Sequence, residues 1–276
     1  WTAGTLLLRQ SGYIQDILNT FGMTECNPIS TPLTAGISHS KLVEVSTFAK
    51  HLPFRNAIGK LVYAATATWL DSPLQQDICP GSPPVLTLST GNQYCIFWYL
   101  QHSKDTSLCF DKHHPSGLTL FKYCNADWGE DINYWKSTSG YIFMLCGATV
   151  SWASKKQSTI ATSSTEAEYT AATLATKEAL WLRNLLKSLN VVQTSPTTMY
   201  EDNQGCIALT HNLVHHERTK HFDIQAHFVS EKFESRDIDL MHLPSAYNTA
   251  DILTKPLPCN LFESLHNHIG LNLCLD

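Results

Sequence analysis

The sequence predicts an α/β fold over residues 118–258, with a mixed five-stranded sheet and helices on both of its faces. Three β-rich runs follow one another with short polar turns between them. A long amphipathic stretch, 162–190, comes next, and two further strand-like runs then alternate with helical segments. This is the order β-β-β-α-β-α-α-β-α. A right-handed crossover makes the first and fourth strands neighbours in one sheet.

The region before this sheet is expected to form a small, partly degenerate α/β segment. Residues 4–10 are strand-like, and Ser11 precedes apolar residues at helical spacing. Residues 54–69 form a second amphipathic helical pattern, and ordered structure is expected again near Trp98.

Two stretches of this first region predict irregular structure. Residues 26–38 contain two prolines and a glycine, which is typical of a linker. Residues 71–91 are rich in Pro, Ser and Gly and have no usable period, which predicts a loop or a disordered patch.

The elements of the main sheet follow from alternation and from helical periodicity. The predicted strands are 118–127, 139–145, 149–155, 197–202 and 237–243. The predicted helices are 162–190, 204–209, 223–233 and one that is entered at Asn248.

The long helix carries two glutamates with different expected roles. Ser163 as N-cap and Glu166 three residues later form a capping box. Glu168 instead heads an apolar stripe, which continues through Ala172, Ala175, Ala179, Leu182, Leu186 and Leu189. A charge on a buried face is costly unless a cation meets it, so Glu168 is either a functional carboxylate or part of a structural ion pair.

Three aspartates are expected on the same side of the sheet as Glu168. Asp127 closes the first strand, Asp202 closes the fourth, and Asp251 lies in the first turn of the last helix. Open α/β sheets place their sites at the carboxyl ends of strands. Four carboxylates that converge there repel one another by roughly 3–4 kcal/mol per pair as an upper figure. Divalent cations remove that cost, and ligation by oxygen alone selects Mg²⁺ or Mn²⁺.

Each aspartate also has a structural interpretation. Asp127 can be a turn residue, and Asp202 can cap the helix that it precedes. Asn248 and Asp251 form a variant of the capping box. The four acids together, at the ends of these elements, favour a metal site.

Several motifs resemble the ribonuclease H domain of copia-type LTR retrotransposon Pol polyproteins. They occur in the order of that family and are KYCNADW (122–128), KSTSGY (136–141), SWASKKQSTIATSSTEAEY (151–169), YEDNQGCIAL (200–209), RTKHFDI (218–224) and NTADILTKPL (248–257). The resemblance implies a ribonuclease H-like fold. It also implies a site for two Mg²⁺ or Mn²⁺ ions in the order Asp-Glu-Asp-Asp, which falls on Asp127, Glu168, Asp202 and Asp251. The family pattern leaves Glu166 possible for the glutamate, and the apolar stripe favours Glu168.

The upstream region resembles the stretch that follows the polymerase palm in the same polyproteins. The likeness rests on residues 11–33 and on FRNAIG at 54–59. The Tyr-x-Asp-Asp polymerase motif is absent, so this chain is not expected to copy nucleic acid. Residues 69–101 are short and Pro-rich where the family has a helical segment, which indicates local decay. The implied division is a reverse-transcriptase remnant (1–117), a ribonuclease H domain (118–258) and a C-terminal tail (259–276).

The resemblance implies an endoribonuclease that cleaves the RNA strand of an RNA–DNA hybrid by two-metal-ion hydrolysis. The implied partners are the hybrid and the upstream polymerase region of the same polyprotein. Polar and basic residues beside the acids are the candidates for contact with nucleic acid: Asn125, Ser164, Thr165, Asn203, Gln204, Lys155 and Lys156. One alternative is a catalytically inactive remnant that keeps the fold. A weaker alternative is an integrase-type nuclease, in which the glutamate comes last rather than second.

Composition sets limits on these functions. A net charge of −5 and a pI near 6.2 argue against a protein that grips nucleic acid by bulk electrostatics. Nine cysteines without a C-x-x-C pair indicate free thiols in a reducing, intracellular compartment. No apolar run approaches the ~18 residues of a membrane span, so no membrane partner is expected. The chain opens at Trp1, and we expect it to be a piece of a longer protein.

Overall fold

A mixed sheet of five strands forms the centre of the computed structural model, which describes residues 4–32, 54–71, 92–129, 134–211 and 220–273. The strands are β3 (Phe121–Ala126), β4 (Thr138–Leu145), β5 (Ala148–Lys156), β6 (Thr197–Glu201) and β7 (Ile238–His242). Their order is β5-β4-β3-β6-β7, with β3, β4 and β5 antiparallel and β3, β6 and β7 parallel. The predicted mixed sheet is confirmed, with its first and fourth strands side by side, and this is the ribonuclease H-like arrangement.

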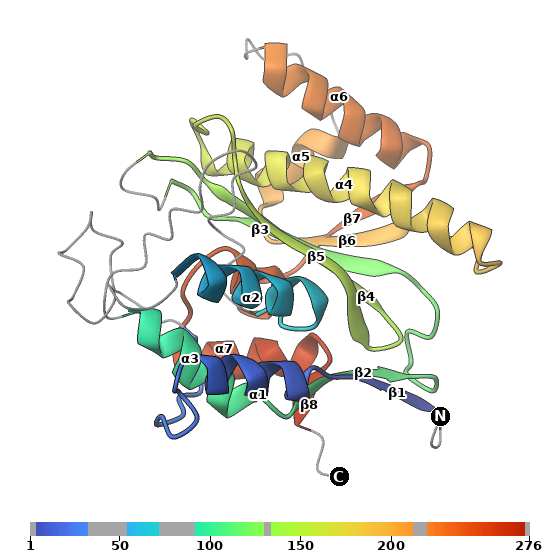
Figure 1. The fold of residues 1–276 in the computed structure, drawn as a ribbon. Helices are drawn as coiled ribbons and strands as arrows, with labels where there is room; N and C mark the ends of the chain where they lie inside the picture. Colours follow the sequence, from blue (N-terminus) through green and yellow to red (C-terminus); the bar gives the residue numbers. More distant parts are fainter. Residues whose placement is uncertain (1–3, 33–53, 72–91, 130–133, 212–219, 274–276) are drawn as a thin grey trace.

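Helices α4 (Ser164–Ser188), α5 (Gln204–His211) and α6 (Lys220–Glu234) cover one face of this sheet (Figure 1). The predicted stripe of α4 is buried there from Ala172 to Leu186, against Phe143 of β4 and Met199 of β6. Leu189 was predicted to end the stripe and is instead 62 % exposed. The helix ends at Ser188, and Leu189 is its C-cap, so the helical spacing no longer applies there.

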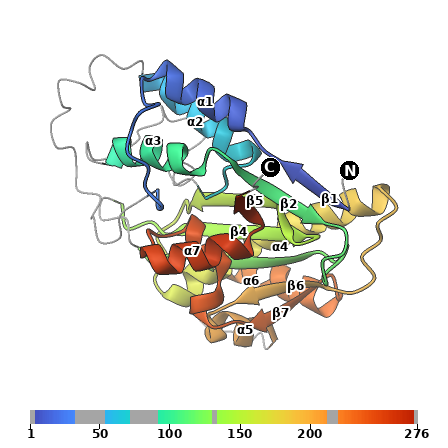
Figure 2. The ribbon, with the colours of Figure 1, turned by 90° about the horizontal axis from the view of Figure 1, so that it is seen from below.

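The N-terminal region and the C-terminal residues cover the opposite face together. Helices α1 (Ser11–Thr20), α2 (Phe54–Ala67), α3 (Asn92–Ser103) and α7 (Cys259–His268) share one apolar core with Ile142 and Met144 of β4. Figures 1 and 2 place α1–α3 and α5–α6 on opposite sides of the central sheet. Helices therefore lie on both faces, as predicted. The predicted boundaries at 117/118 and 258/259 stay predictions, although described residues on both sides of each contribute to this core.

A second, three-stranded sheet joins the two ends of the described chain. Its order is β1-β2-β8, with β1 (Thr5–Leu8) and β8 (Leu271–Leu273) both antiparallel to β2 (Thr106–Asp111). The strand predicted at 4–10 is confirmed as β1. Sequence reasoning missed β2, α3, α7 and β8. Residues 259–276 were interpreted as a tail, and the ordered structure expected near Trp98 was not assigned to a helix or a strand.

Two short 3₁₀ helices follow the last strand of the main sheet, η2 (Ser245–Tyr247) and η3 (Thr249–Leu253). The helix predicted to begin at Asn248 is therefore a 3₁₀ helix of five residues. Of the predicted irregular stretches, residues 33–38 and 72–91 lie outside the described residues. Among the helices that the structure describes, none has the length and apolar character to cross a membrane.

Candidate metal centre

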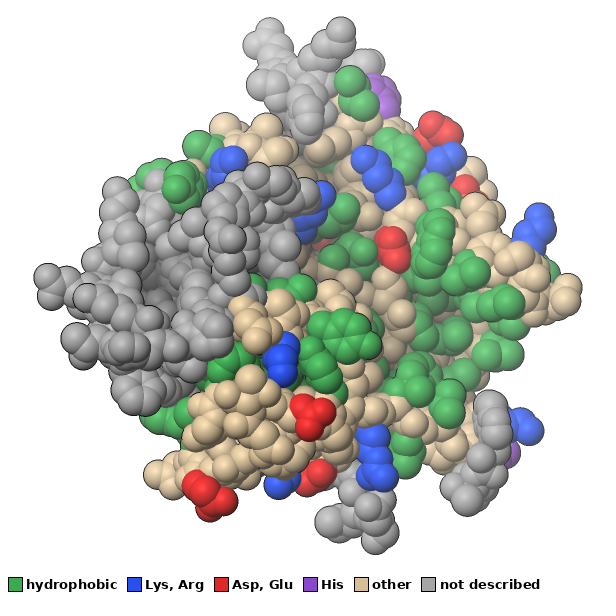
Figure 3. Space-filling model, in the orientation of Figure 1, with side chains coloured by type: hydrophobic (Ala, Val, Ile, Leu, Met, Phe, Trp, Pro, Cys, Tyr) green, Lys and Arg blue, Asp and Glu red, His purple; other side chains and the backbone are tan. Residues whose placement is uncertain are grey.

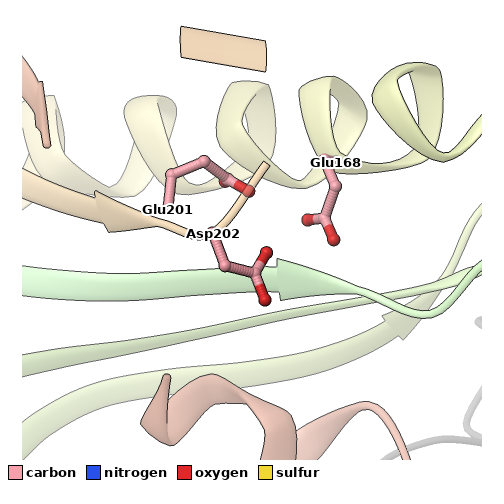
Figure 4. Close-up of side chains that lie close together, drawn as sticks. All are labelled: Glu168, Glu201 and Asp202. Atoms are coloured by element: carbon pink, nitrogen blue, oxygen red, sulfur yellow. The ribbon is translucent and has the colours of Figure 1, made fainter. Parts of the chain in front are cut away.

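Three carboxylates meet where β6 ends and α4 begins. Glu168, Glu201 and Asp202 each offer an oxygen, and these oxygens lie within 4.8 Å of one another. Figure 4 shows Glu168 reaching from α4 towards Asp202, with Glu201 and Asp202 at the end of β6. The structure thus brings together two of the four predicted acids, and it adds Glu201, which sequence reasoning missed.

Glu168 lies almost wholly inside the protein, with 6 % of its surface exposed. Its Oε2 accepts a hydrogen bond from the backbone N–H of Ala126 at 2.7 Å, which ties α4 to the end of β3. Burial raises the pKa of Glu168 well above its ordinary value, and the negative charges of Glu201, Asp202 and Asp251 raise it further. The Ala126 N–H has the opposite effect and is not sufficient to offset these causes. A buried carboxylate in this setting is stabilised in its charged form by a cation.

Glu201 is fully buried behind the other two acids. The Cys124 thiol donates to its Oε2 at 3.2 Å, and the backbone N–H of Asn203 donates to its Oε1 at 3.2 Å. Burial raises the pKa of Glu201 to about 8, although both hydrogen bonds lower it. The signal for Glu201 was present in the strand pattern, because Met199 and Glu201 alternate onto the buried face of β6.

A buried lysine lies on the same face as Glu201. Lys122 of β3 is fully buried, with its Nζ 5.7 Å from the centre of the Phe143 ring. Burial lowers the pKa of Lys122 to about 8, while nearby groups including Glu201 raise it. Its positive charge in turn lowers the pKa of Glu201. Lys122 is thus an internal cation close to the acids, which the sequence did not single out.

Asp251 lies on η3, on the opposite face of the sheet from α4. It is 2 % exposed, and the Lys255 Nζ lies 2.9 Å from its Oδ2. Its charge contributes to the raised pKa of Glu168, but it is not one of the three acids within 4.8 Å. The predicted cap is Asn248 alone, whose Oδ1 accepts from Ala250 N–H at 3.3 Å.

Asp127 follows β3 directly and is turned towards the neighbouring strand. Its Oδ1 accepts a hydrogen bond from the backbone N–H of Thr138, and its own N–H donates to the Thr138 carbonyl at 3.1 Å. These contacts extend the pairing of β3 with β4 by one residue. Asp127 is not a member of the three-acid cluster, and its assignment as a metal ligand stays a prediction.

Asn125, two residues before Asp127, lies beside Asp202. It is 2 % exposed, and its Nδ2 donates to Asp202 Oδ2 in a long hydrogen bond of 3.4 Å. Its Oδ1 accepts from the Thr254 hydroxyl at 3.1 Å. Asn125 was predicted to contact nucleic acid, and the structure gives it partners inside the protein.

The remaining predicted contact residues differ in their exposure. Ser164, Gln204 and Lys155 are exposed, whereas Thr165, Asn203 and Lys156 are half-buried. Asn203 caps α5 through its Oδ1, which accepts from Cys206 N–H at 3.0 Å, so the cap is Asn203 rather than Asp202. The nucleic-acid roles of these residues stay predictions.

The start of α4 differs in one detail from the predicted capping box. Ser163 Oγ accepts from Glu166 N–H at 3.2 Å, as predicted. The Glu166 carboxylate reaches past Ser163 and accepts from the backbone N–H and the hydroxyl of Thr162. Glu166 is therefore a capping residue.

On the face shown in Figure 3, the described Lys, Arg, Asp and Glu side chains are scattered rather than gathered into a patch of one sign. This agrees with the small share of charged residues in the sequence, 16 %.

Comparisons with known proteins place this chain beside retrotransposon polyproteins. It is 34 % identical over 284 residues, 98 % of its length, to the Retrovirus-related Pol polyprotein from transposon TNT 1-94 of Nicotiana tabacum. It is 31 % identical over 271 residues to the corresponding polyprotein from transposon RE1 of Arabidopsis thaliana. The chain spans about a fifth of the length of these curated relatives, 21 % and 18 % respectively. No protein-family model matches it.

Among solved structures, the chain is similar to LC11-RNase H1, which was isolated from compost by a metagenomic approach. The superposition has a TM-score of 0.40 at 14 % identity, and it covers 50 % of this chain and 93 % of the other.

Proposed function

Because this chain is a relative of the copia-type retrotransposon Pol polyproteins over nearly its whole length, we propose that its central sheet carries a hybrid-specific endoribonuclease. The proposed reaction is hydrolysis of the RNA strand of an RNA–DNA hybrid with two divalent cations, Mg²⁺ or Mn²⁺. The observation that carries the proposal is the meeting of Glu168, Glu201 and Asp202 at one edge of a ribonuclease H-like sheet.

The donor set fits such cations. Carboxylate oxygens are the ligands that Mg²⁺ and Mn²⁺ prefer. The acids of this centre repel one another, and Glu168 and Glu201 are buried, so a cation relieves both costs. When bound, a pair of these ions supplies an activated water and stabilises the leaving oxygen. We propose Glu168, Asp202 and Asp251 as ligands, with Glu201 behind them. Asp127, the fourth acid of the sequence prediction, must leave Thr138 to take part.

The protein's own contribution is to fix the acids in place. Glu168 is held by the Ala126 N–H, so its carboxylate keeps its position relative to the end of β3. Asp202 is held between that strand and the start of α5. Rigid positioning of ligands on a helix and strands lowers the cost of assembling the reactive geometry.

The N-termini of α4 and α5 lie against each other, near the acids. We propose that they form a surface that binds the hybrid. A Cβ on Gly205 would lie 3.0 Å from Thr165 Oγ1, so the glycine permits this close approach. Helix N-termini favour phosphate, because their free N–H groups point outwards. We propose that Ser164, Thr165 and Gln204 contact the sugar–phosphate backbone here, together with Lys155 and Lys156. Because the net charge of the chain is −5, we propose that substrate capture depends on the upstream polymerase region.

A cleavage assay tests this function. The full chain is incubated with a hybrid whose RNA strand is end-labelled, in Mg²⁺, in Mn²⁺ and in chelator, beside the variant Glu168→Gln. We expect metal-dependent cutting of the RNA strand by the wild type that the variant loses. Duplex DNA of the same sequence is the control, and preference for it would favour the integrase-type alternative. Absence of cutting at every metal concentration would favour the inactive remnant.

A further inference from the structure

A buried neutral amide, Asn125, donates a hydrogen bond to Asp202, one of the acids of the candidate metal centre. We infer that Asn125 limits the affinity of this centre for divalent cations, and that aspartate at this one position raises that affinity. The inference rests on the proposed function, since it concerns the same centre.

Asn125 uses both ends of its amide group, Nδ2 and Oδ1, for contacts near the proposed ligands. Its Nδ2 donates to Asp202 Oδ2, and the next residue in the chain, Ala126, donates its N–H to Glu168. Its Oδ1 accepts from Thr254, whose hydroxyl also lies 3.4 Å from the carbonyl oxygen of Asp251. The buried Asn125 therefore contacts Asp202 directly and reaches the backbone of Asp251 through Thr254.

Asp127 does not take this place, although it lies two residues further along. Its carboxylate is engaged with the backbone of Thr138, on the β4 side. The side chain of Asn125 contacts the proposed ligand Asp202.

An amide and a carboxylate have opposite effects on a bound cation here. The Nδ2–H donates to an oxygen of Asp202 that a cation also needs, and the amide brings no negative charge. Aspartate at position 125 has nearly the same shape and can still accept the Thr254 hydrogen bond. It removes the competing donor and adds one charge close to the ion, so it favours the metal-bound state. Without metal, the added charge increases the repulsion within the cluster.

The test compares Mn²⁺ binding by the wild type, Asn125→Asp and Asn190→Asp, using titration calorimetry and the electron paramagnetic resonance of free Mn²⁺. Asn190 is exposed beyond the far end of α4 and controls for the added charge alone. We expect Asn125→Asp to bind Mn²⁺ about 10–100-fold more tightly than the wild type. Asn190→Asp should match the wild type. Equal affinities in the wild type and Asn125→Asp would overturn the inference, and so would an equal gain in both variants.

Thermal unfolding provides a second readout, which also covers the case that Asn125→Asp folds poorly without metal. Its melting temperature should be below that of the wild type in chelator and above it in saturating Mn²⁺. The double variant Asn125→Asp/Asp202→Asn keeps one amide and one carboxylate with their places exchanged. It should return both the melting temperature in chelator and the Mn²⁺ affinity towards the wild type. If the double variant binds Mn²⁺ as tightly as Asn125→Asp, the number of carboxylates does not determine the affinity, which would contradict the inference.

The cleavage assay separates this inference from the proposed function. Tighter Mn²⁺ binding by Asn125→Asp without cutting of the hybrid supports the inference and overturns the function. Cutting by the wild type, with no change in Mn²⁺ affinity in Asn125→Asp, supports the function and overturns the inference. If both hold, Asn125→Asp should reach half of its maximal cleavage rate at a lower metal concentration than the wild type.

Discussion

The carboxylate of Glu168 accepts the backbone N–H of Ala126 at 2.7 Å, so the first turns of α4 are joined to the carboxyl end of β3. This contact holds a buried acid, whose pKa is raised well above its ordinary value, beside the acids that follow β6. The position of Glu168 is thus set by a hydrogen bond between elements and not by α4 alone.

Replacing Glu168 should affect cleavage far more than replacing Glu166. Glu168→Gln keeps an oxygen for the Ala126 N–H but removes the charge that a cation needs, and we expect a loss beyond the ~10–100-fold that outer-shell substitutions cost. Glu166→Gln changes a capping contact with Thr162, so activity should remain within a few-fold and stability should fall by about 1 kcal/mol or less. Steady-state cleavage rates and urea unfolding of both variants check this. Equal losses of activity would show that the helix-face assignment is wrong.

Removing the charge of Asp202 should stabilise the metal-free protein while it abolishes cleavage. Asp202 repels Glu168 and Glu201, and Asp202→Asn relieves that repulsion. We expect the free energy of unfolding in chelator to rise by about 1 kcal/mol, because partial exposure of Asp202 screens the interaction. In saturating Mn²⁺ the wild type should be the more stable of the two. A melting temperature that falls in chelator would mean that Asp202 has a structural role.

Truncating Asp127 should primarily weaken the fold. Asp127→Ala leaves the buried N–H of Thr138 without its side-chain acceptor, which costs about 1–3 kcal/mol in urea unfolding. Asp127→Asn keeps that acceptor, so its stability should lie within about 1 kcal/mol of the wild type. Its Mn²⁺ affinity should change by only a few-fold. An affinity loss as large as that of Glu168→Gln would show that Asp127 leaves Thr138 to bind the ion.

Glu201 should make stability depend on pH between about 5 and 8. In the folded protein its pKa is raised from 4.5 to about 8, so the folded state holds a proton that the unfolded state has released within this window. Stability is then highest near the low end and falls as pH rises, by at most about 1.4 kcal/mol per pH unit. The pKa of Lys122 is lowered from 10.5 to about 8. Lys122 therefore makes stability increase with pH, and it does so above pH 8, outside this window.

Urea unfolding in chelator at pH 5, 6, 7 and 8 measures this dependence. Glu201→Gln has no proton to release, so its stability relative to the wild type should grow as pH rises. Glu234→Gln, an exposed glutamate at the end of α6, is the matched control. A difference between Glu201→Gln and the wild type that is constant across the series would contradict the prediction.

The chain alone should bind an RNA–DNA hybrid weakly. Its net charge of −5 leaves few cations to displace counterions from the phosphates, so the logarithm of the binding constant should fall only slightly as salt rises. Fluorescence anisotropy at several salt concentrations measures both quantities. Low-nanomolar affinity at physiological salt would contradict this expectation.

Much of the main sheet was predictable because its elements have clear periods. Alternation placed the strands to within a few residues, and helical spacing placed Glu168 on the buried face of α4. The order of elements made β3 and β6 neighbours before their pairing was seen. The N-terminal region was less predictable, because α3 and α7 bury their apolar residues against β4 and against each other, and that partner is distant in the sequence.

The sequence by itself determined the mixed sheet, the buried face of α4, and the end of the sheet at which acids gather. Only the tertiary structure decided which side chains meet there. Asp127 turns to a backbone N–H of β4, Asn125 contacts Asp202, and Glu201 meets Glu168 and Asp202 with Lys122 nearby. The physical reason is that periodicity depends on the backbone of one element, whereas a buried side chain takes the orientation in which donors and acceptors on neighbouring elements satisfy it.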